Sequence, residues 1–258
     1  AEVIDNASTG TVTRRGNGTI NFTAAQTFNN GFSILDSTIA NAATNVNSTL
    51  AITSGGMLIS GLKYRNTVTW NGAVDIQSGG LTIIGTGDNV TNGAILNVNS
   101  ASTVTGAIVL RGGDLRLAGG GGRLSEVTSI LVSGVSRSIS NNTLQGLNLI
   151  NSATGGNNTN RINDSASIML DGGRVTMNGV GAGNYSETLG ALSLLGGSNL
   201  IYADRNGSTS TALTFQSLTR TAGTGSTIVF DTVRSNTDTG ATISFSSPPT
   251  LTNGIIGG

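Results

Sequence analysis

The stretch Arg111–Gly120, RGGDLRLAGG, sets two glycines before a short alternating run and two more behind it. In this run Leu115 and Leu117 are predicted to face a core, because successive side chains of a strand point to opposite faces. The charged residues beside them, Asp114 and Arg116, are predicted to face water. Glycine supplies the positive φ or the close backbone approach that a tight corner requires. The stretch therefore predicts a short strand that begins at a glycine corner.

The same arrangement recurs along the chain. Five Gly-Gly pairs precede short apolar runs, with the second glycine at positions 56, 80, 113, 173 and 197. The steps from 56 to 80 and from 173 to 197 are equal, and the two steps between them are longer. This degenerate repeat is typical of a solenoid, a propeller or an array. The chain lacks the longer blade repeat of a propeller and the aromatic strands and proline-bearing turns of a β-sandwich. We therefore predict an all-β fold, a right-handed parallel β-helix (β-solenoid) with Gly-rich corners.

The composition agrees with this fold. The 258 residues include 39 Gly, 28 Asn, 29 Ser and 36 Thr, which together make up half of the chain. Hydrophobic residues still account for 36%, in short runs rich in Ile, Val, Leu and Thr, which favours order and strands over disorder and helices. Stacked turns place like residues above one another, so we expect ladders of Asn or Thr that hydrogen-bond along the axis.

The charge pattern argues against several classes of partner and reaction. The 13 basic and 13 acidic residues give a net charge of zero, so no field would attract nucleic acid. No apolar run reaches the roughly 20 residues of a membrane span. The chain has no Cys and no His, and its one lysine, Lys63, follows no phosphate-binding glycines. We therefore predict a protein that is not an enzyme and that uses no cofactor or metal.

Two sharper motifs have simpler explanations. Acids and arginines beside the corners could form the stripe of a polysaccharide-degrading β-helix enzyme; these are Arg111, Asp114, Arg116, Asp171 and Arg174. Solvated charges beside turns explain them better, because no pair of carboxylates is visible. The sequence Gly85-Thr-Gly-Asp88 hints at a calcium repeat, but a single imperfect copy is better explained as a turn. Ten Asn-x-Ser/Thr matches leave glycosylation open.

The Gly-Gly-led strands, the segment SETLGALSLLGGSNLIY (186–202) and the end PTLTNGIIGG (249–258) resemble the autotransporter-associated β-strand repeats of adhesin-like passenger proteins on bacterial surfaces. The resemblance is clearest over roughly the last 90 residues and weakest over the first 50. It implies a secreted, cell-surface location and a parallel β-helical stalk, and says little about activity. The chain begins Ala1-Glu2-Val3 without a signal peptide, so we expect a processed form or a piece of a longer parent chain.

The phenylalanines gather near the two ends of the sequence. They are Phe22, Phe28 and Phe32, and then Phe215, Phe230 and Phe245. The end turns of a solenoid expose an apolar cross-section and open strand edges, so these residues are candidates for end-to-end assembly; the simpler explanation is that the end turns are wider. We divide the chain into an N-terminal segment, residues 1–50, as a cap or assembly arm, and solenoid repeats over residues 51–258.

Three functions remain in competition. The favoured one is a structural extracellular β-solenoid on a bacterial cell surface, which forms a fibre or stalk by head-to-tail packing with itself, or with further repeats of a longer chain. The second is an adhesin fragment that binds surface glycans through a groove exposing aromatic residues such as Tyr64 or Trp70. The third, a polysaccharide-degrading β-helix enzyme, is the weakest.

Overall fold

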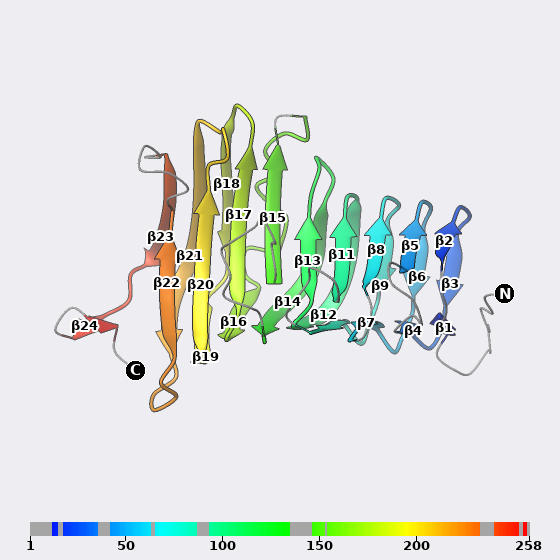
Figure 1. The fold of residues 1–258 in the computed structure, drawn as a ribbon, viewed down its shortest axis with the longest axis horizontal. Coiled ribbons are helices and arrows are strands. Elements are labelled where there is room, and N and C mark those ends of the chain that lie inside the picture. The colour runs from blue at the N-terminus through cyan, green and yellow to red at the C-terminus, as the bar shows by residue number, and fades with distance from the viewer. Residues whose placement is uncertain are drawn as a thin grey trace.

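The computed structural model is a parallel β-solenoid of about 8 turns. It describes residues 12–14, 18–35, 42–62, 65–86, 93–134, 146–152, 154–232, 240–252 and 255–256, and no helix occurs among them. The turns stack along the long axis of the molecule, with the N-terminal turns at one end and the C-terminal turns at the other (Figure 1). The predicted all-β solenoid is confirmed.

A regular turn passes through three faces, which we call sheet 1, the side arm and sheet 2. Sheet 1 has nine strands: β2 (Thr19–Phe22), β5 (Ala42–Val46), β8 (Asn66–Trp70), β11 (Ala94–Val98), β13 (Asp114–Leu117), β15 (Gly146–Ser152), β17 (Arg174–Val180), β20 (Ser198–Asp204) and β22 (Thr227–Asp231). All of its neighbouring strands are parallel.

A fourteen-stranded sheet forms the other two faces. Sheet 2 consists of β1 (Val12–Arg14), β4 (Phe32–Ile34), β7 (Met57–Gly61), β10 (Leu81–Gly85), β12 (Ala101–Arg111), β14 (Arg123–Ser133), β16 (Ser167–Asp171), β19 (Leu192–Gly196) and β21 (Ser210–Arg220). The side arm consists of β3 (Gln26–Phe28), β6 (Leu50–Ile52), β9 (Val74–Ile76), β18 (Asn184–Leu189), β23 (Ala241–Ser247) and the N-terminal halves of β12, β14 and β21. The long strands β12, β14 and β21 therefore serve two faces at once.

Two further observations complete the topology. A short antiparallel pair, β24 (Leu251–Thr252) and β25 (Ile255–Ile256), lies near the C-terminal end. The described part of residues 1–50 contributes β1 to β5 and the first residue of β6, and these strands pair in the same sheets as the later strands. Whether this segment acts as a cap or an assembly arm stays a prediction.

The glycine pairs occupy two different corners of the turn. Gly55–Gly56 and Gly79–Gly80 lie just before the sheet 2 strands β7 and β10. The other three pairs lie between sheet 2 and sheet 1, at 112–113, 172–173 and 196–197. A step from one corner to the other accounts for the irregular spacing between Gly80 and Gly113. The Gly-rich corners are confirmed, but the pairs mark two positions in the repeat rather than one.

Stacking explains why glycine is required at these corners. Gly56 has a φ of +68°, and a Cβ atom on it would lie 2.5 Å from the carbonyl oxygen of Gly79 in the next turn. Gly197 has a φ of +60°, and a Cβ atom there would lie 2.7 Å from the backbone nitrogen of Gly172. Side chains would therefore strain the backbone and separate the turns.

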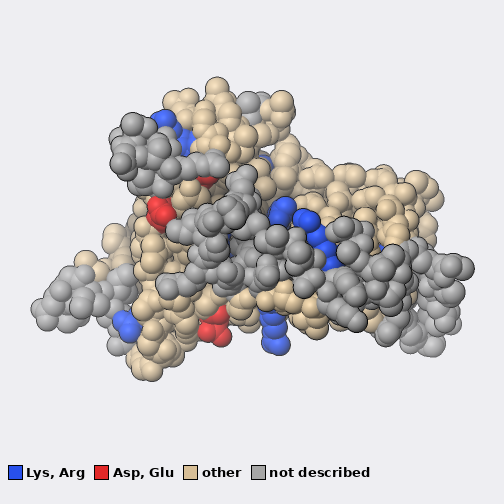
Figure 2. Space-filling view, in the orientation of Figure 1, with Lys and Arg blue, Asp and Glu red and all other residues tan. Residues whose placement is uncertain are grey.

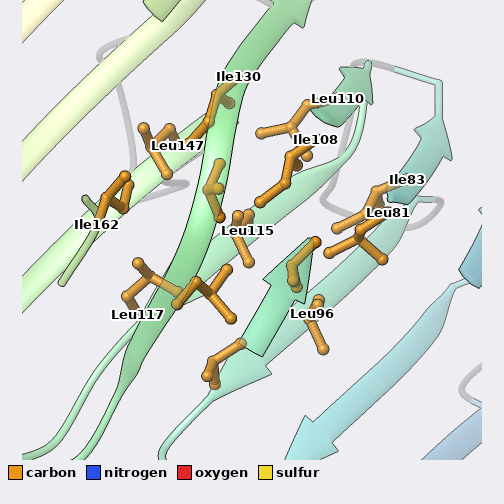
Figure 3. Packing of buried hydrophobic residues seen from close by; sticks show 14 of the residues in the cluster. Leu81, Ile83, Leu96, Ile108, Leu110, Leu115, Leu117, Ile130, Leu147 and Ile162 are labelled. Atoms are coloured by element: carbon orange, nitrogen blue, oxygen red, sulfur yellow. The ribbon is translucent and has the colours of Figure 1, made fainter. Parts of the chain in front are cut away.

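The core is built from rows of apolar side chains that run along the axis. In sheet 1 one inward row continues in register from Val68 through Leu96, Leu115, Leu147 and Val175 to Ile201. All six side chains are buried, and Figure 3 shows several of them beside residues of sheet 2. Complete burial of each such side chain contributes about 1.5–3 kcal/mol. Leu115 and Leu117 lie in the core as predicted.

Asparagines form the expected ladder on the outside. Asn71 donates its Nδ2 to Asn47 Oδ1 over 2.9 Å, and Asn99 donates its Nδ2 to Asn71 Oδ1 over 3.0 Å. The three residues follow β5, β8 and β11 in consecutive turns. Asn45 and Asn21 make a similar bond of 2.8 Å. The ladders link turns through side chains, in addition to the backbone bonds of the sheets.

Candidate functional site: the two ends of the solenoid

The C-terminal end of the solenoid is an open, apolar cross-section. Phe230 on β22 pairs with Ile201 and so continues the inward row of sheet 1, but 38% of the residue is exposed. Its ring lies edge-on to the ring of Phe245, with centroids 5.6 Å apart, and Phe245 stacks on Phe215 at 5.9 Å. Phe215 is buried, whereas Phe245 is only partly buried. The last turn therefore presents core-type side chains to the outside.

The N-terminal end carries a second aromatic cluster. Phe28 and Phe32 stack with ring centroids 4.8 Å apart, and Phe22 lies edge-on to both, at 6.3 and 5.9 Å. All three side chains are buried. They fill the interior of the turn formed by β2, β3 and β4. The six predicted residues thus form two clusters of three, one in a turn near each end, and their role in assembly stays a prediction.

Three strand edges meet at each end. Among the described residues, β1, β2 and β3 each pair with one neighbour only, namely β4, β5 and β6. At the other end, within the part of the chain that the structure describes, β22 pairs only with β20, β23 only with β21, and the C-terminal residues of β21 only with β19. Each end therefore offers one edge from sheet 1, one from sheet 2 and one from the side arm. Unpaired edges of this kind are templates for pairing with another strand.

The acid and arginine residues beside the corners are only partly brought together. Asp114, Arg116 and Arg174 lie on the outward face of sheet 1, whereas Arg111 and Asp171 are exposed at the ends of β12 and β16. Arg116 forms a 2.8 Å ion pair with Asp114. The prediction that Asp114 faces water is wrong, because only 1% of the residue is exposed.

Arg174 lies on the same outward face as Asp114 and Arg116, on β17, which is separated from β13 by β15. It donates its Nε to Thr176 Oγ1 over 3.0 Å, and its guanidinium lies 6.0 Å from the centre of the Tyr202 ring. Burial lowers the pKa of Arg174, and the nearby charge of Asp114 opposes that shift. The cluster holds one carboxylate, whereas glycoside hydrolysis uses a pair on either side of the scissile bond. Its geometry fits a paired, buried charge group better than an acid–base site.

A buried network that the sequence did not reveal lies around Arg161. Its guanidinium donates to Asn151 Oδ1 from Nε over 2.9 Å, and to the carbonyl oxygens of Gly122 and Gly119 over 2.6 and 2.8 Å. Glu187 on β18 accepts the backbone N–H groups of Arg161 and Ile162 over 2.8 and 3.1 Å. Glutamate occurs only three times in the chain, and that rarity was the one signal available in the sequence.

Burial shifts the ionisation of both charged members of this network. Desolvation lowers the pKa of Arg161 to about 10, against the opposing charge of Glu187. Desolvation likewise raises the pKa of Glu187 to about 8, although its two backbone donors and Arg161 act in the opposite direction. At neutral pH the guanidinium remains charged, and the native state favours a protonated Glu187.

The remaining sequence candidates contribute little to a site. Trp70 is completely buried in the core, so it cannot line an exposed aromatic groove. Tyr64, Lys63 and Asp88 lie outside the described residues. Within the described ranges no three His, Cys, Asp or Glu side chains gather as metal ligands, and no helix is long and apolar enough to cross a membrane. On the face shown in Figure 2, the charged residues form small separate groups.

The fold defines this chain as a β-solenoid protein. No family model, no curated protein and no solved structure matches the sequence.

Proposed function

We propose that this chain is a structural extracellular β-solenoid of a bacterial cell surface, which forms a fibre or stalk by end-to-end packing and β-edge pairing. The observation that carries the proposal is the agreement between the two ends. β22, β23 and the C-terminal residues of β21 would meet β2, β3 and β1 of a second copy, sheet to sheet and in the parallel sense used throughout the stack. A head-to-tail contact of this kind leaves each new end open and so generates a filament.

The side chains at the C-terminal end support the same contact. Phe230 and Phe245 continue core rows beyond the last complete turn, so a following turn would bury them as each earlier turn buries the one before it. The net charge of zero adds no long-range repulsion between copies. Backbone pairing would provide affinity, and the aromatic rings would fix the position of the two ends.

The cell-surface location rests on the resemblance of the Gly-Gly-led strands to secreted passenger repeats. A fibre subunit outside the cell needs no cofactor and no catalytic group, which agrees with a chain free of His and Cys. Its function would lie in its length and in the strength of its junctions.

Electron microscopy of the protein isolated from its source, without added ligand, tests the proposal. We expect filaments with an axial repeat of about 40 Å, because nine stacked strands are spaced by roughly 4.8 Å each. Isolated short rods at every protein concentration would overturn self-assembly and leave a stalk segment or an adhesin fragment as the better explanation. Filaments with a repeat unrelated to the length of the solenoid would also contradict end-to-end packing.

A further inference from the structure

A polar groove lies where the side arm is interrupted. Between β15 and β16, residues 154–166 contribute no strand to the side arm, and Ile162 makes a single bridge to Leu124. Next to this segment, the N-terminal halves of β12 and β14 border an open groove of about 560 Å³. Asn160 and Asn163 line the groove from the interrupted segment. This volume lies within the usual range for small-molecule sites.

The lining is rich in hydrogen-bonding groups and carries no net charge. Thr103 and Ser125 are neighbours in register on the two strands, and their hydroxyls lie 3.4 Å apart. Arg123 and Glu126 stand on the same strand, roughly 10 Å apart, and both are exposed. The groove therefore offers a cation, a carboxylate, hydroxyls and amides within a short distance of one another.

Buried hydrogen bonds fix the segment that carries Asn160 and Asn163. Arg161 and Ile162, which lie between Asn160 and Asn163, are buried. The Arg161 guanidinium is fixed by Asn151 and by the carbonyl oxygens of Gly119 and Gly122, and the backbone N–H groups of both residues donate to Glu187. Asn163 Oδ1 also accepts from the backbone and hydroxyl of Ser165 over 3.1 and 2.9 Å. An irregular segment is thereby given a fixed shape, which lowers the entropy cost of binding a ligand.

Glu126 occupies a conformation that favours glycine. Its φ is +63°, and it is the one non-glycine residue with a positive φ in the described part of the chain. The corner before sheet 2 in the two preceding turns has glycines with positive φ, Gly80 and Gly106. The pairing of β12 and β14 also shifts register at this point. A side chain kept in a strained position at the rim of a groove points to a role for that side chain.

We propose that this groove binds a neutral oligosaccharide. Sugar hydroxyls would donate to the Glu126 carboxylate and accept from the Arg123 guanidinium. The amide of Asn160 would donate and accept, and Asn163 would donate from Nδ2, because its Oδ1 already accepts from Ser165. A lining with one positive and one negative side chain favours a ligand without net charge. The site lies on the side of the solenoid and is independent of end-to-end packing, so a fibre would carry one groove on every subunit.

Titration calorimetry with cellotetraose, maltotetraose, xylotetraose, mannotetraose and chitotetraose tests this proposal. We expect saturable binding of at least one probe, weakened at least tenfold by Glu126→Gly and by Asn163→Ala. Glu126→Gly is the sharper variant, because glycine relieves the backbone and should raise resistance to denaturant while it removes binding. Thr128→Ala, an exposed change on the same strand beyond the groove, should leave binding unchanged.

Two outcomes would overturn the proposal. The first is that none of the five oligosaccharides shows saturable binding at concentrations up to millimolar. The second is binding that Glu126→Gly and Asn163→Ala leave intact, which would place the ligand elsewhere. Filament formation by Glu126→Gly is expected to match that of the parent chain, so the groove and the assembly hypothesis fail or succeed separately.

Discussion

Glu187 accepts the backbone N–H of Arg161 over 2.8 Å, while the guanidinium of Arg161 turns away toward Asn151 and the 119–122 corner. The Glu187 carboxyl group thus accepts hydrogen bonds from residues 154–166, where the side arm has no regular strand. The Arg161 guanidinium in turn donates to the 119–122 corner of the preceding turn. A buried arginine and one of the three glutamates of the chain thus stabilise a turn that has no regular side-arm strand.

The raised pKa of Glu187 makes stability depend on pH. An unfolded glutamate titrates near 4.3, whereas burial raises the pKa of Glu187 to about 8 in the folded chain. The native state therefore holds a proton that the unfolded state releases between these values. The contribution of Glu187 to stability is therefore greatest below pH about 4.3, falls as the pH rises toward about 8, and is lost above that pH. Glu187→Gln should flatten this decline and be the more stable protein above pH about 8.

Denaturant unfolding followed over this pH range measures the effect. Glu126→Gln is the matched control, because it makes the same substitution at an exposed site outside the Arg161 network. A slope that persists in Glu187→Gln would assign the pH dependence to another group.

The corner glycines should differ sharply in their tolerance of a methyl group. Gly223→Ala places a side chain at a φ of +74° with nothing within 4 Å, so only the backbone is strained, at a cost of about 1 kcal/mol. Gly56→Ala adds a collision with the carbonyl oxygen of Gly79, and we expect a loss of about 3 kcal/mol. The denaturant midpoints of the two variants measure the difference. If both fall by the same amount, the close contact between stacked turns is not what requires glycine at position 56.

The asparagine ladder should weaken by steps. Asn71→Ala removes both bonds of its ladder, whereas Asn99→Ala removes one. The side chains are exposed, so we expect a loss of about 1 kcal/mol for Asn71→Ala and about half of that for Asn99→Ala. Thermal unfolding of the two variants compares them directly, and a larger loss in Asn99→Ala would contradict an additive ladder.

Phe230 should control assembly with little effect on folding. Phe230→Ser removes the ring that ends a core row. Full burial of a phenylalanine contributes about 1.5–3 kcal/mol, and docking would bury only the 38% of the residue that is still exposed, so its expected share is about 0.6–1.1 kcal/mol. The critical concentration for filament formation should therefore rise by about 3- to 6-fold. Val229→Ser is the control, because this neighbour is 47% exposed and points away from the row. Sedimentation measures both, with circular dichroism to verify folding.

If Phe230→Ser and the parent chain form filaments equally well, the ring of Phe230 has no role in end-to-end packing. Equal loss in both variants would instead point to a general sensitivity of β22, without a specific role for the ring.

Much of the architecture could be predicted because stacking imposes local rules on every turn. Alternation predicted that Leu115 and Leu117 lie in the core, and both are buried. Glycine pairs marked the corners. The sequence could not separate the two corners, because close backbone approach and positive φ demand glycine at both.

The polar groups were harder to predict for a different reason. Alternation shows which face of a strand carries Asp114, but not what covers that face, and Asn148 and Thr176 on the following strands are buried there as well. The groove and the Arg161–Glu187 network arise in a turn without a regular side-arm strand. The repeat in the sequence reflects what the turns share, so it gives no signal for the one turn that differs.

The length of a turn varies although the strands stay in register. Ala43 pairs with Thr67, Ile95 with Asp114, and Asp114 with Gly146, so the number of residues between paired positions differs from turn to turn along the rod. The extra residues lie between the strands, so the backbone hydrogen bonds that join paired strands stay the same whatever the length of the connection. Such a gene can gain or lose segments at its corners while the rod persists, and a foreign peptide spliced into a long corner would be displayed at a fixed height along it.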